Sequence, residues 1–237
     1  MDMIFQILFS ILGLGIPVLI IGGIIYFIVK LKGGSSIKFS YRGILKIYFY
    51  VVILISVGIL VLGGVSTLLK VGFGEVVASE FSYGEVHKDH RNLQERIKRE
   101  GDKYVPYNVD DETRSLSEKV EIAMKSNLVN GLSLTIVGLF LATVHFLGRR
   151  WVEAKDETAD LLKKWYLIAG LVIFAAATII SLIAGVPGTL RYALLDVNPG
   201  EESPGESLSI AITALPVWLL YLVATVRAVK DSPDKES

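Results

Sequence analysis

Five long apolar segments alternate with polar stretches along this chain. None of the five contains Asp, Glu, Lys or Arg. A helix rises about 1.5 Å per residue and the hydrocarbon core of a bilayer is roughly 30 Å thick, so about 20 residues are enough to cross it. The pattern predicts five transmembrane helices, at Met3–Val29, Ile47–Leu69, Leu128–Gly148, Trp165–Val186 and Ser207–Val226.

The first apolar segment has a second interpretation, a secretory signal peptide. No basic residue precedes it, and it is longer than the apolar region of such a signal. These features favour an uncleaved membrane helix. Because the segment exceeds the length needed to cross, we expect it to tilt, bend at Pro17 or extend beyond the core.

Basic residues concentrate in alternate loops, which predicts the orientation. The loop between the fourth and fifth segments has one basic residue, Arg191, against several acids, and only Asp2 is charged before the first segment. The N-terminus is therefore expected outside and the C-terminus in the cytoplasm of a cell-membrane protein. The residues on the expected cytoplasmic side are Lys30, Lys32, Lys38, Arg42, Lys46, Arg149, Arg150, Lys155, Lys163, Lys164, Arg227, Lys230 and Lys235.

A hydrophilic insert at 70–127 separates the second and third segments. From Glu85 to Glu100 the apolar positions follow one narrow helical face, and Gly101 is a suitable helix terminator. A second helix is expected to start near Asp110 or Ser115, where Ser115 and Glu118 fit a capping box, and to continue into the third segment. The fold class is thus an all-α membrane protein with five transmembrane helices and an extracytoplasmic amphipathic helical hairpin between helices 2 and 3.

The hairpin has three possible roles. It is expected to lie on the outer membrane surface or on a neighbouring chain. Packing onto its own bundle as a cap, docking a partner and sensing a ligand remain alternatives.

The chain divides into a leading part and two hairpin units that resemble each other. Lys164–Ile168 (KWYLI) resembles Lys46–Tyr50 (KIYFY), and Gly185–Leu190 (GVPGTL) resembles Gly64–Leu68 (GVSTL). Such similarity predicts a parallel duplication about an axis along the membrane normal, although two apolar hairpins also look alike by chance. The expected divisions are 1–43 (leading helix and basic cytoplasmic loop), 44–148 (first unit, with the insert), 149–230 (second unit) and 231–237 (cytoplasmic tail).

The two returning segments carry a family resemblance. The third ends in Phe140–Trp151 (FLATVHFLGRRW) and the fifth in Pro216–Arg227 (PVWLLYLVATVR). A returning helix with this ending, a short charged loop and a Tyr-bearing apolar helix resembles the DUF5671 family of prokaryotic membrane proteins, over roughly Gly43 to Lys230. The family has no established activity, so the resemblance implies architecture and a prokaryotic source. The chain departs from the family at Tyr221, where a His is usual, and in its long insert.

Composition narrows the function classes further. Of 237 residues, 52% are hydrophobic and the mean hydropathy is +0.53, which exceeds the value usual for soluble domains. The 24 basic and 24 acidic residues give zero net charge, so no overall field favours nucleic acid. The chain has no cysteine, which removes disulfides, thiolate metal sites and thiol catalysis.

Histidines are the only candidates for chemistry. His87 and His90, near Glu85 and Asp89, share a helix at a spacing that suits one side of a zinc or copper site. Two histidines make half a site, so solvated helix surface is the expected role. His145 lies near the cytoplasmic end of the third segment, where an interface anchor is favoured over a proton carrier. No catalytic, cofactor-binding or metal residue is assigned, and no cofactor is predicted.

Small residues recur at helical spacing in two segments. Such residues let membrane helices approach closely, so they mark either packing within the chain, which is favoured, or a dimer seam. They are Gly131, Thr135, Gly138 and Ala142 in the third segment, and Ala177, Ser181 and Gly185 in the fourth.

Three function classes remain. The first is a non-catalytic structural or accessory subunit that assembles with itself or with other membrane proteins. The second is a homo-oligomeric channel or small transporter, and the third a membrane-embedded enzyme or redox carrier. The absence of charged residues within the segments disfavours ion-coupled transport. The expected partners are the lipid bilayer and a membrane protein or second copy, without nucleic acid, and the chain is expected not to be an enzyme.

Overall fold

The computed structural model describes residues 41–101, 113–152, 157–195 and 200–230. The first predicted span, Met3–Val29, and the predicted tail at 231–237 lie outside these residues. All regular structure in the described part is helical.

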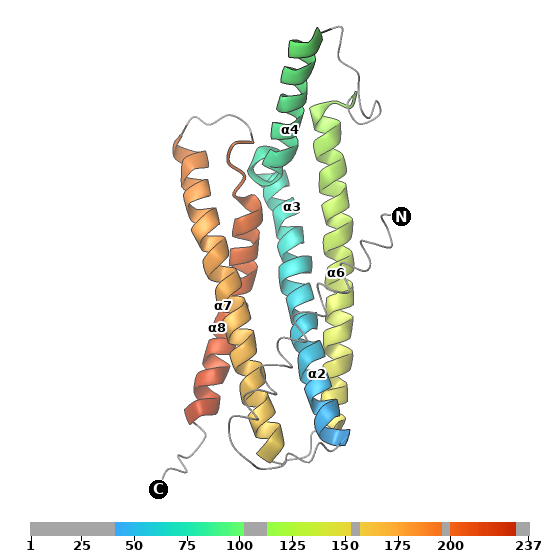
Figure 1. Ribbon diagram of the computed structural model, residues 1–237, viewed down its shortest axis with the longest axis vertical. Helices are drawn as coiled ribbons and strands as arrows, with labels where there is room; N and C mark the ends of the chain where they lie inside the picture. The colour runs from blue at the N-terminus through green and yellow to red at the C-terminus, as the bar shows by residue number, and fades with distance from the viewer. Residues whose placement is uncertain (1–40, 102–112, 153–156, 196–199, 231–237) are drawn as a thin grey trace.

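Four long antiparallel rods form the described bundle (Figure 1). The first is built from α2 (Tyr41–Gly58), a π-helical stretch η1 (Ile59–Val65) and α3 (Ser66–Val76). The others are α6 (Leu116–Val152), α7 (Glu157–Leu194) and α8 (Gly205–Lys230). Contacts are densest between α2 and α6 and between α7 and α8, so the bundle consists of two helical hairpins.

Four described helices are long and apolar enough to cross a membrane, as a multi-pass protein requires. They are Leu45–Val76, Leu116–Val152, Leu162–Leu194 and Gly205–Lys230. Each contains one of the predicted spans, so four of the five predicted segments are confirmed as helices. All four helices extend past their apolar stretches into polar residues. Once a helix has started, each further residue adds a backbone hydrogen bond, and many polar residues are good helix formers.

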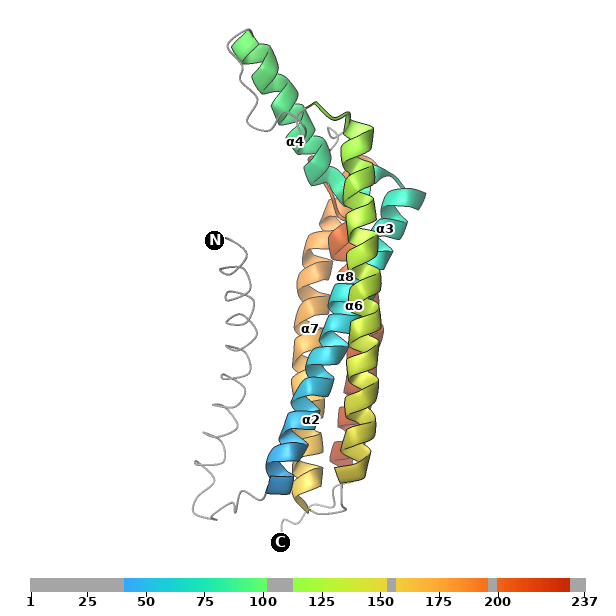
Figure 2. The same ribbon diagram turned by 90° about the vertical axis from the view of Figure 1, so that its right-hand side faces the viewer.

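The insert differs from the predicted hairpin. Helix α4 (Ser79–Glu100) begins before Glu85, with non-helical backbone angles at Tyr83, and it ends at Gly101 as predicted. It leans away from α6 instead of lying along its full length (Figure 2). The second predicted helix is the first part of α6, whose Glu118 N–H donates to Ser115 Oγ at 3.3 Å.

Gly101 explains the end of α4. Its φ of 54° lies in the left-handed region, which glycine adopts without a steric penalty. Its N–H still donates to the Ile97 carbonyl, and the chain then leaves the helix. The predicted link at 104–107 lies outside the described residues.

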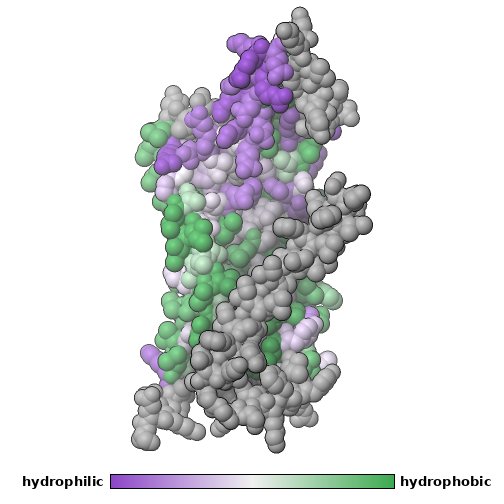
Figure 3. All heavy atoms as spheres, viewed as in Figure 1, coloured by the Kyte–Doolittle hydropathy of each residue, from purple (hydrophilic) through white to green (hydrophobic). Residues whose placement is uncertain are grey.

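The core lies where the two hairpins meet. Phe174 and Ala214 are fully buried, and the ring of Phe174 stacks on that of Tyr221 with centroids 5.7 Å apart. Leu54, Val61 and Leu167 complete the buried cluster. Polar side chains gather over α4 at one end, while the rods below are mostly apolar on the face seen in Figure 3.

Candidate functional site

The predicted histidine pair divides between buried and partly exposed positions. His87 is 8% exposed and its Nε2 lies 3.0 Å from Ser79 Oγ, so the prediction of solvated surface is wrong for this residue. The extra turn of α4 before Glu85 covers it. Glu85 and Asp89 are exposed, and among the described residues no three His, Cys, Asp or Glu side chains gather as metal ligands.

His87 makes the start of α4 sensitive to acid. Burial lowers its pKa below the ordinary 6.5, Glu80 partly opposes this shift, and His90 adds to it. The unfolded segment therefore takes up a proton before the folded one. The stabilising effect of the neutral ring is present above 6.5 and is lost as the pH falls through the lowered folded value.

We expect faster hydrogen exchange in residues 79–90 at about pH 5.5 than at about pH 7.5, after correction for intrinsic exchange. In His87→Gln, whose amide does not titrate but can still bond Ser79, this acid-induced increase should disappear. An equal increase in His87→Gln would contradict the assignment to His87.

His145 is held at both ring nitrogens. Its Nδ1 lies 2.8 Å from the Leu141 carbonyl, and its Nε2 lies 3.1 Å from the Tyr48 hydroxyl. Because a carbonyl can only accept, Nδ1 donates, and a neutral ring then accepts from Tyr48 at Nε2. The Tyr48 contact joins α6 to α2, while the predicted role as a membrane-interface anchor stays a prediction.

The small-residue steps pack within the chain. An added Cβ at Gly138 would lie 2.8 Å from the Leu60 backbone nitrogen, and one at Gly131 would lie 2.9 Å from Leu68. In the second hairpin, Gly185 faces Leu208 in the same way, and Ser181 is buried. Ala142 and Ala177 are partly buried. These contacts support the favoured interpretation over a dimer seam.

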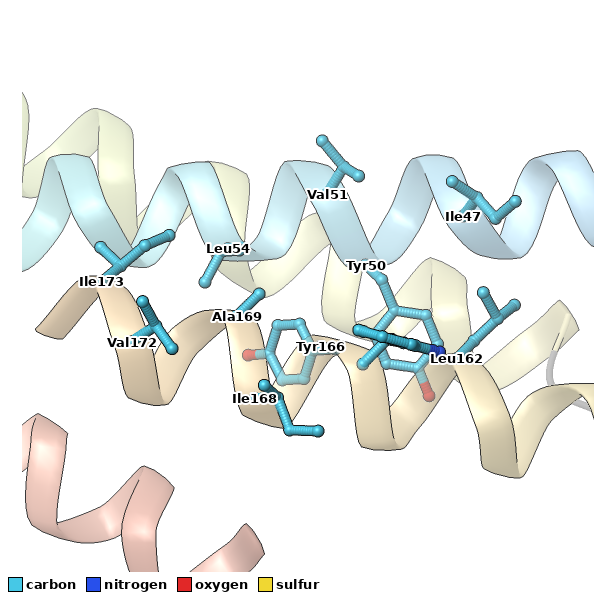
Figure 4. Close-up of a pocket in the computed structure, with 11 residues that line it drawn as sticks. Ile47, Tyr50, Val51, Leu54, Leu162, Tyr166, Ile168, Ala169, Val172 and Ile173 are labelled. Atoms are coloured by element: carbon cyan, nitrogen blue, oxygen red, sulfur yellow. The ribbon is translucent and has the colours of Figure 1, made fainter. Parts of the chain in front are cut away.

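An apolar groove of about 360 Å³ runs between α2 and α7 (Figure 4). Tyr50 and Leu54 are buried and form its floor, whereas Ile168 and Val172 are 41% and 60% exposed and form its rim. The Tyr166 hydroxyl already bonds that of Tyr221 at 2.7 Å. The groove therefore suits an apolar occupant. The lining residues are Ile47, Tyr50, Val51, Leu54, Leu162, Trp165, Tyr166, Ile168, Ala169, Val172 and Ile173.

A smaller polar pocket of about 170 Å³ lies at the other end of the bundle, between α3, α6 and α8. Lys70 forms an ion pair with Glu206 across it, and the Lys70 ammonium also lies 5.5 Å from the centre of the Tyr83 ring. Asn127 donates to the Tyr83 hydroxyl at 3.4 Å. These contacts tie both hairpins to the start of α4.

Sequence reasoning missed the Lys70–Glu206 pair, although a signal was present. Lys70 follows the second predicted span directly and Glu206 precedes the fifth directly. Both therefore lie at the same predicted membrane surface, and their charges are opposite. The positions of Lys70 and Glu206 at the span boundaries, together with their opposite charges, would have suggested this contact.

Among the described residues that line them, neither pocket brings together a group arranged for catalysis. The groove offers apolar and aromatic surface, and the charges of the polar pocket neutralise each other. No protein-family model, curated protein or solved structure matches this chain.

Proposed function

We propose that this chain is a non-catalytic accessory subunit of a cell membrane that assembles with itself or with another membrane protein. Its N-terminus lies outside and its C-terminus in the cytoplasm. The observation that carries the proposal is α4, a charged helix that leaves the bundle at the end opposite the basic loops (Figures 1 and 2).

The shape of α4 supports a docking role. Its first turns are fixed, because Phe81, Ser82, Tyr83 and His87 are buried. Beyond His90 most side chains are exposed or half-exposed, including Gln94 and the charged residues at 98–100. A helix that is anchored at one end and exposed at the other presents a preformed surface, which reduces the entropy lost on binding.

The bundle interior supports this role over a channel within one chain. Phe174, Thr178, Ala214 and Ser209 fill the centre and are almost inaccessible to solvent. The centre of the described helices therefore offers no conducting path, and the channel alternative relies on an oligomer.

The resemblance to the DUF5671 family and the prokaryotic source it implies are part of the same proposal. The pairing of α2 with α6 and of α7 with α8 is what a duplicated hairpin would produce, so it supports the proposed repeat. Tyr221, where the family usually has His, packs between the rings of Phe174 and Tyr166.

One experiment tests orientation and assembly together. The chain has no cysteine, so a single Gln94→Cys change directs labelling to α4. Intact cells are treated with a membrane-impermeant maleimide that carries a photoreactive group, and are then illuminated. We expect labelling and a protein adduct of defined mass, about twice 26.0 kDa if the partner is a second copy.

Ser232→Cys, in the C-terminal tail, is the orientation control and should label only after permeabilisation. Labelling of Ser232→Cys in intact cells would show that the orientation is reversed. Labelling of Gln94→Cys without an adduct would contradict assembly through α4.

A further inference from the structure

The α2–α7 groove is a seam between two separately packed hairpins. Helix α2 packs mainly on α6 and α7 mainly on α8, while α2 and α7 share a smaller contact. The rings of Tyr50 and Tyr166, with centroids 5.2 Å apart, close the floor of the seam. A helix laid along this groove would contact both hairpins at once and gain van der Waals contacts that the open seam lacks.

The chain itself contains a segment of suitable chemistry, which the structure does not describe. Met3–Val29 is uncharged and apolar, and the link Lys30–Ser40 connects it to Tyr41 at the start of α2. Tyr41 lies at the same end of the bundle as Ile47 and Leu162, the groove residues nearest that end. Extended chain reaches about 3.3 Å per residue, so this link of eleven residues spans up to roughly 36 Å.

The lengths also correspond. On α7 the groove extends from Leu162 to Ile173, which is about 16 Å at 1.5 Å per residue. The twelve residues of the leading segment nearest the link, Val18–Val29, would form a helix of this length. It contains Gly22 and Gly23, and glycines let a membrane helix approach another closely.

We propose that residues 18–29 of the chain's own leading segment occupy the α2–α7 groove, as a fifth helix antiparallel to α2. The occupant contacts α2 of one hairpin and α7 of the other. Its docking covers Ile168 and Val172, so these residues face protein instead of lipid. The assignment concerns the interior of one chain and does not depend on the proposed accessory role.

Disulfide cross-linking in native membranes tests the proposal without background, since the chain has no cysteine. Single cysteines are placed in turn at each of positions 22–25, which cover the helical turn opposite Ile168 in the antiparallel arrangement, together with Ile168→Cys on the rim. A protease site inserted at Ser35 cuts the link after oxidation. We expect at least one pair to keep the full-length mass on a denaturing gel, and reduction to release the N-terminal fragment.

Leu220→Cys is the matched control on α8. Its side chain is 69% exposed, and its neighbour Tyr221 packs on Gly170, so it lies near the depth of Ile168 on another face. It should give no retained full-length chain with any of the four positions. Val172→Cys, paired with single cysteines at positions 18–21 opposite it, serves as a second rim position in case Ile168→Cys fails to fold.

Two results would overturn the proposal. Cross-links that appear only at twice the chain mass would show that a second copy occupies the groove. Cross-linking by neither rim position, in variants that retain the thermal stability of the parent, would show that lipid covers it.

Discussion

Truncation of Phe174 to alanine is expected to lower the free energy of unfolding by about 3–5 kcal/mol. The side chain is fully buried, and it stacks on Tyr221 with an interplanar angle of 14°. Its removal leaves a cavity between α7 and α8, the most extensively packed pair of helices. In a bilayer, where lipid is as apolar as the core, the loss comes mainly from packing contacts.

Phe140→Ala is the control for this prediction, because Phe140 on α6 is 64% exposed in the described bundle. We expect it to change stability by about 0.5 kcal/mol or less. Reversible unfolding of the purified protein, by denaturant or by steric trapping in lipid bicelles, measures both variants. Losses of equal size would show that Phe174 is not part of a tightly packed core.

Gly64→Ala is the second large effect, with an expected loss of about 1–3 kcal/mol. The π-helical stretch brings Gly64 against α6, where an added Cβ would lie 2.7 Å from the Thr135 backbone nitrogen and 2.9 Å from its Cα. Backbone atoms cannot rotate away as a flexible side chain can. The substitution must therefore separate the first rod from α6.

Gly58→Ala is the matched control, one turn and a half earlier in the same rod. An added Cβ there meets nothing within 4 Å, so the change should be neutral or slightly stabilising because alanine favours helix. Thermal melting in one detergent compares the pair. A loss at Gly58 as large as that at Gly64 would mean that glycine is needed for helix flexibility and not for close approach.

Local patterns in the sequence predicted what depends on local forces. Uninterrupted apolar runs predicted four of the described helices, and the absence of a helix breaker between Glu118 and Leu128 predicted that α6 runs through the insert into the span. The end of α4 at Gly101 and the Ser115 cap also followed from residues close in sequence.

Contacts between distant residues were not predictable in the same way. His87 is buried because α4 starts at Ser79 and the α7–α8 connection lies beside the first turns of this helix. The helical periodicity around His87 did not indicate this burial. The π-helical turn at Ile59–Val65 contains Gly64, which lies against Thr135 of α6, a contact between residues far apart in sequence. Both features come from tertiary packing, which overrides local preference.

The attachment of α4 has a mechanical consequence. Only Val77 and the extended Ala78 separate its first turn from α3, and the Gly84 N–H donates to Ser203 Oγ at 3.1 Å in the α7–α8 connection. A force applied at Glu100 is therefore transmitted along α4 to its first turns, which contact both hairpins. Such a load is shared between them, and sliding of α3 along α8 is resisted by the Lys70–Glu206 pair.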